Sequence, residues 1–75
     1  MNNKRRKQIK KMIEKLEEVM QELEHVIDDE QQYFENIPES LQETDKAVAS
    51  EEAFGYLENA LSAIEDTLEN LNSIE

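Results

Sequence analysis

Large apolar side chains recur every seven residues along most of this chain, and this spacing restricts its fold more than any other feature. A repeat of seven is typical of α-helices that pack nearly parallel, crossing by about 20° in the left-handed sense. In the first half of the chain three positions of the repeat are filled, which makes a stripe too wide for one neighbouring helix. The three rows are Ile9, Leu16, Leu23, Ile37; Met12, Val19, Val26, Tyr33; and Ile13, Met20, Ile27, Phe34.

The first row contains one charged residue, Glu30, where a large apolar side chain is expected. Its carboxylate could reach solvent at the edge of the stripe, or it could be buried. Burial of an unpaired charge costs several kcal/mol or shifts the group to its neutral form. The pattern therefore favours a carboxylate at the edge of the stripe.

A second helical pattern begins after Pro38, which disfavours helical backbone at the residue before it. Thr44 or Asp45 is suited to start the second helix, and Ser50 is a later candidate cap. The second helix carries two heptad rows with alanines beside them. Gly55 lies inside this helix, and we interpret it as making room for the side chain of Tyr33 or Phe34. The two rows are Phe54, Leu61, Leu68 and Leu57, Ile64, Leu71.

These patterns predict an all-α fold with one domain over residues 1–75: a helix over about 3–36, a loop over 37–44 and a helix over about 45–74. Such a connection favours an antiparallel hairpin. A chain of 75 residues without cysteine has a marginal core, so we expect two hairpins to form a homodimeric four-helix bundle. The expected core and dimer residues are Ile9, Met12, Ile13, Leu16, Val19, Met20, Leu23, Val26, Ile27, Phe34, Phe54, Leu57, Leu61, Ile64, Leu68 and Leu71.

Charge is distributed unevenly in this acidic chain, whose net charge is −11. Residues 1–15 hold seven basic residues against Glu14 and carry +6, whereas residues 16–75 carry −17. The basic segment could contact phosphates, but no base-reading motif accompanies it, and pairing with the acidic second helix is favoured. Candidate partner contacts are Arg5, Arg6, Lys7 and Tyr56.

The chain offers little chemistry for catalysis or for metal binding. Glu22 and His25 have a Glu-x-x-His spacing, but both lie off the apolar rows and the second helix has no histidine. No nucleophile with its base and no glycine-rich phosphate loop is found, so we expect no enzymatic activity, cofactor, metal or small-molecule substrate. Leu41 is expected to close the core at the loop end. The absence of a long apolar run favours a cytoplasmic protein.

The motif Asn36-Ile37-Pro38-Glu39-Ser40-Leu41-Gln42, with the helical patterns around it, resembles small uncharacterised proteins of phages and mobile elements of Gram-positive bacteria. The resemblance implies a bacterial host cell and a role in binding a host or phage protein, but it implies no functional residue. The expected function is therefore a non-enzymatic protein–protein interaction module. Two alternatives remain: an acidic decoy of a nucleic-acid-processing enzyme, and a nucleic-acid-binding accessory that uses the basic end.

Overall fold

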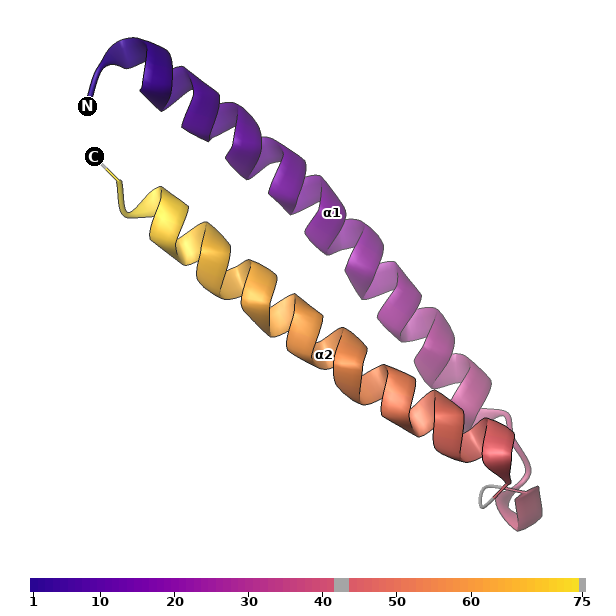
Figure 1. Ribbon diagram of the computed structural model, residues 1–75. Helices are drawn as coiled ribbons and strands as arrows, with labels where there is room; N and C mark the ends of the chain where they lie inside the picture. Colours follow the sequence, from indigo (N-terminus) through magenta and orange to yellow (C-terminus); the bar gives the residue numbers. More distant parts are fainter. Residues whose placement is uncertain (42–43, 75) are drawn as a thin grey trace.

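Two long helices in contact along their length make up the fold (Figure 1). The computed structural model describes residues 1–41 and 44–74. Helix α1 spans Asn3–Glu35, the short 3₁₀ helix η1 spans Glu39–Leu41, and α2 spans Asp45–Asn72. Both termini lie at one end and the connection at the other, so the predicted all-α hairpin and the approximate helix bounds are confirmed. The molecule is a rod of 59 × 15 × 13 Å.

Local hydrogen bonds explain where each helix begins and ends. The side chain of Asn2 accepts a hydrogen bond from the N–H of Arg5 at 2.9 Å, which caps α1. At the other end Asn36 is the C-cap, and Pro38 comes two residues later. Thr44 starts α2 because its hydroxyl oxygen accepts from the N–H of Ala47, while the same hydroxyl donates to the carbonyl of Leu41 at 2.7 Å.

The seam between the helices uses two of the three apolar rows of α1. The rows that begin at Ile9 and Ile13 are half-buried along α1, and Ile27 is fully buried. On α2 the seam follows alternating steps of three and four residues from Ala47 to Leu71, with Ala47 and Leu68 buried. The seam is thus an antiparallel pair of heptad patterns. Few side chains are fully excluded from water, as expected of two helices alone.

The loop end is more open than the sequence predicts. Leu41 is 49 % exposed, so the prediction that it closes the core is wrong. Tyr33 is also 49 % exposed and lies outside the core. The reason is geometric: the 3₁₀ turn projects beyond the helix ends, and Tyr33 belongs to the row of α1 that α2 does not cover.

Gly55 faces open space, which overturns its interpretation as room for Tyr33 or Phe34. A Cβ atom built at this position meets no atom within 4 Å, and its φ is not positive. We therefore expect Gly55→Ala to raise the free energy of unfolding by about 1 kcal/mol, because alanine loses less backbone entropy in a helix. Urea denaturation followed by circular dichroism measures this change. A loss of stability would contradict it and would mean that a second chain packs against Gly55.

Of the described residues, neither helix has a stretch long and apolar enough to span a membrane.

Candidate interaction surface

One apolar row of α1 remains at the surface of the hairpin. Met12, Val19, Val26 and Tyr33 are spaced by seven, so they lie along one side of the helix, and each is between 45 and 49 % exposed. We call these four residues the outer row. All were predicted from sequence to be apolar stripe positions, and three of them to be core or dimer residues. Within one hairpin they contribute little to the seam.

A row of α2 borders the same side of the hairpin. Tyr33 and Lys46 line one surface hollow of about 550 Å³ at the loop end, so their rows flank the seam on the same face. The α2 row continues from Lys46 at intervals of seven and holds mainly small side chains, Ala53, Ala60 and Thr67, before Ile74. We call Lys46, Ala53, Ala60, Thr67 and Ile74 the small row, and the two rows together the outer face. The outer face has one charged side chain, Lys46, and all of its residues except Ala53 are exposed.

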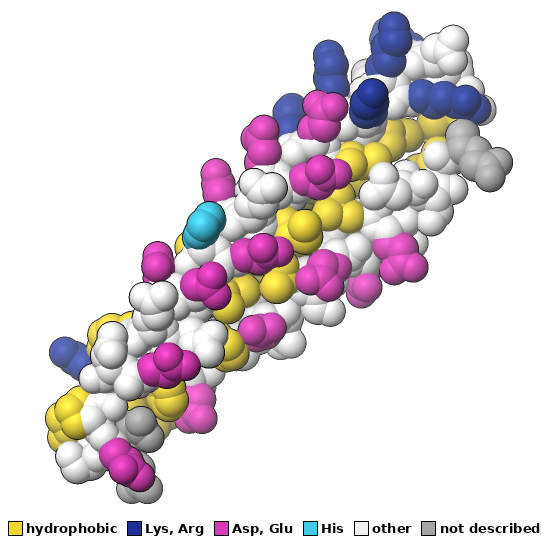
Figure 2. Space-filling model, turned by 180° about the vertical axis from the view of Figure 1, so that it is seen from behind, with side chains coloured by type: hydrophobic (Ala, Val, Ile, Leu, Met, Phe, Trp, Pro, Cys, Tyr) yellow, Lys and Arg dark blue, Asp and Glu magenta, His cyan; other side chains and the backbone are white. Residues whose placement is uncertain are grey.

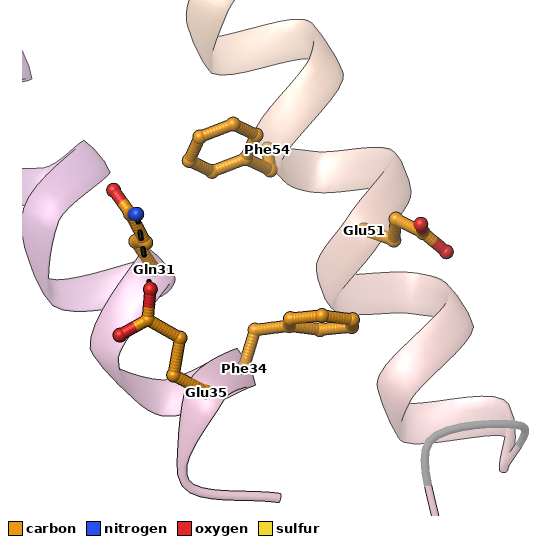
Figure 3. Close-up of a pocket in the computed structure, with 5 residues that line it drawn as sticks. All are labelled: Gln31, Phe34, Glu35, Glu51 and Phe54. Atoms are coloured by element: carbon orange, nitrogen blue, oxygen red, sulfur yellow. Dashed lines mark hydrogen bonds between the residues drawn. The ribbon is translucent and has the colours of Figure 1, made fainter. Parts of the chain in front are cut away.

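The opposite broad face is acidic. Figure 2 shows a face on which carboxylates line both sides of the apolar seam, while most of the basic side chains gather at one end of the rod and one lies near the other end. Gln31 and Glu51 lie on the acidic side, since they line a hollow of about 320 Å³ with Phe34 and Phe54 (Figure 3). Phe34 and Phe54 come from different helices, and Gln31 Nε2 donates to Glu35 Oε1 at 3.1 Å beside them. This hollow has an apolar floor and a polar rim.

Glu30 has a specific partner inside the seam. The hydroxyl of Ser50 donates a short hydrogen bond to Glu30 Oε1, and Ser50 is only 4 % exposed. Glu30 is half-buried, so its carboxylate is partly withdrawn from water but hydrogen-bonded. The sequence placed Glu30 at the edge of the apolar stripe. In the structure Glu30 also forms a polar layer with Ser50 in the seam. Ser50 is not the helix cap, since Thr44 holds that position.

The sequence contained a signal for this polar layer. The α2 rows extend one heptad toward the N-terminus, from Phe54 to Ala47 and from Leu57 to Ser50. An antiparallel register that sets Ile9 beside Leu71, which line one hollow, also sets Glu30 beside Ser50. Extending both rows to the end of the helix would therefore have paired the two polar residues.

The basic end is formed by exposed side chains of the first turns of α1. Arg5, Arg6 and Lys7 are all exposed, and Arg6 and Lys10 line a hollow of about 200 Å³ with Leu71 and other α2 residues. Basic residues therefore do lie beside the C-terminal end of α2, as predicted. Because these groups are solvated, an ion pair with an acidic residue of α2 would contribute only about 0–1 kcal/mol.

Tyr56, a candidate partner contact, is 77 % exposed and lies on α2 away from the seam. It lines an open hollow of about 410 Å³ with Glu52, Gly55 and Asn59. The hollow is shallow and open to solvent. It offers an aromatic ring for contact with another chain but no enclosed site.

Glu22 and His25 are both exposed on α1. Across residues 1–41 and 44–74 no group of three or more histidine and acidic side chains comes together in a way that could hold a metal ion. The hollows are lined mainly by apolar groups and solvated charges.

Comparison with protein families, with curated proteins and with solved structures finds no match to this chain.

Proposed function

We propose that this chain is a non-enzymatic protein–protein interaction module that binds a second copy of itself through the outer face, forming a four-helix bundle. The observation that carries the proposal is the outer row, four large apolar side chains at heptad spacing that the hairpin leaves 45–49 % exposed. A second hairpin placed face to face would remove them from water. Burial contributes about 25 cal/mol for each Å² of apolar surface.

The size of the face supports the same proposal. A standard interface buries roughly 800 Å² on each partner, and the broad face of a rod of 59 × 15 Å has a comparable extent. The hairpin needs such a partner, since of its described apolar residues only Ile27, Ala47 and Leu68 are buried. Small domains of this kind gain stability by oligomerisation.

The test is the molar mass in solution, measured by light scattering during gel filtration. We expect about twice the chain mass of 8.8 kDa for the wild type. The double variant Val19→Glu/Val26→Glu is expected to be a monomer with unchanged helical content, because four buried carboxylates in a dimer would be unpaired. Both valines are exposed in the single hairpin, so the variant can still fold.

Val48→Glu is the matched control. Val48 is 43 % exposed, similar to the outer row, but it lies on α2 outside the outer face, so the same substitution there should leave the dimer intact. A wild-type mass of one chain would overturn the proposed function. A dimer that survives in the Val19→Glu/Val26→Glu variant would show that another surface holds the copies together.

A second function is supported by the acidic face: competition with nucleic acid for the binding site of another protein. Carboxylates spread along both sides of the seam give this face the sign of a phosphate backbone (Figure 2). The context proposed for both functions is a bacterial cell that expresses phage or mobile-element genes, where the target would be a host or phage protein. If the chain displaces no DNA from purified nucleic-acid-processing enzymes at low salt, this second function fails.

A further inference from the structure

We infer that the two copies pair with their loops at opposite ends of the bundle, so that each α1 lies antiparallel on the α1 of its partner. The inference rests on the proposed dimer and deepens it. Two symmetric face-to-face arrangements exist for a pair of hairpins. In one the loops share an end and α1 lies over the partner's α2; in the other the loops lie at opposite ends and α1 lies over the partner's α1.

The outer row is symmetric about its own centre. Its four residues are spaced evenly, and the midpoint falls between Glu22 and Leu23. An antiparallel copy centred there places Val19 on the partner's Val26, and Met12 on the partner's Tyr33. Two valine pairs would then fill the centre, and a methionine sulfur would meet an aromatic ring at each end, a contact worth about 0.3–1.5 kcal/mol.

The charge along the rod favours the same arrangement. Residues 23–58, which include the loop, hold eleven acidic residues and Lys46 and carry −10. Residues 1–22 and 59–75 meet at the other end and together carry only −1, because seven basic residues offset eight acidic ones. Loops at one end would bring two regions of −10 together. Loops at opposite ends instead set each strongly acidic region against a nearly neutral one that presents basic side chains.

Individual charges support this at residue level. In the antiparallel pair Lys15 comes level with Asp29 of the facing α1. Lys15 and Asp29 are both exposed in the single hairpin, and they share a heptad row that lies next to the outer row. With α1 over the partner's α2, Lys15 comes level with Glu65, which shares a heptad row with Glu51 on the acidic face and so points away from the outer face, while the two loop ends repel each other.

Disulfide trapping distinguishes the two arrangements, because the described chain has no cysteine of its own. Single-cysteine chains are mixed in pairs under a mild oxidant, with a tag on one chain to mark mixed dimers. We expect Val19→Cys mixed with Val26→Cys to give a covalent mixed dimer in high yield. The matched control is Val26→Cys mixed with Ala53→Cys, because these two residues would meet only with α1 over the partner's α2. We expect this mixture to give at least tenfold less covalent mixed dimer.

A second measurement leaves the outer face untouched. A spin label on Asn3→Cys reports the distance between the two N-terminal ends in the dimer. Loops at opposite ends place these labels near opposite ends of a rod 59 Å long, whereas loops at one end place them within about 20 Å, two helix spacings. A short label distance, or efficient trapping of the Val26→Cys and Ala53→Cys pair, overturns the orientation while the dimer stands. A wild-type mass of one chain overturns the dimer itself.

Discussion

Replacement of Ile27 by alanine is expected to lower the free energy of unfolding by about 2–4 kcal/mol. Ile27 is 6 % exposed and is the one described residue of α1 that is fully buried. Alanine removes three carbons from the middle of the seam and leaves a space that two helices cannot easily close. A chain of 75 residues has a total stability of about 4–11 kcal/mol, so the loss is a large share of it.

The measurement is urea denaturation at one fixed protein concentration, since association stabilises the folded state by mass action. Ile27→Val should cost only about 0.5–1.5 kcal/mol. Val48→Ala truncates an apolar side chain at a residue that is 43 % exposed and outside the outer face, and should change stability by no more than about 0.5 kcal/mol. Equal losses at Ile27 and Val48 would contradict the position of the seam.

The polar layer in the seam predicts opposite effects for a single and a double variant. Glu30→Ala leaves the hydroxyl of Ser50, which is 4 % exposed, without its acceptor. We expect it to lower the free energy of unfolding by about 1–3 kcal/mol. Glu30→Leu/Ser50→Ala replaces both partners with apolar groups and completes the heptad rows. The double variant should be more stable than the wild type by about 1–3 kcal/mol, by analogy with buried ion pairs replaced by packed apolar residues.

Ser50→Ala alone completes a double-mutant cycle, which measures the coupling energy between Glu30 and Ser50. Its effect should be smaller than that of Glu30→Ala, because the half-buried carboxylate can turn toward water. A double variant less stable than the wild type would mean that the hydrogen bond contributes more than the apolar contacts that replace it. The same denaturation measurement gives all three values.

Much of the hairpin followed from the sequence because its signals are local. Pro38 disfavours helical backbone at the residue before it, Asn36 and Thr44 are residues that favour helix ends, and heptad spacing alone predicts paired helices. These features depend on neighbours within a few residues. That is why the predicted bounds of both helices agree with the structure within about two residues.

Which rows face α2 could not be read from the spacing. The row of Ile9 lies between the rows of Met12 and Ile13, and either pair gives alternating steps of three and four. The structure pairs the rows of Ile9 and Ile13, whose side chains are larger, and leaves valines at the surface. Gly55 was misinterpreted for a related reason: its neighbours are set by the rotation of α2, which a heptad count does not give.

The rod shape has a consequence for how this protein moves through water. Its radius of gyration is 17.3 Å, against about 11 Å for a compact domain of the same length. A single hairpin should therefore experience high friction and leave a gel-filtration column early, as though it were a larger globule. A side-by-side pair of rods has twice the mass of one rod but little added length. Its frictional coefficient therefore exceeds that of one rod by a smaller factor than the one that separates a sphere from a sphere of twice the volume. One hairpin and two should elute close together, and the scattered intensity, rather than the elution volume, separates them.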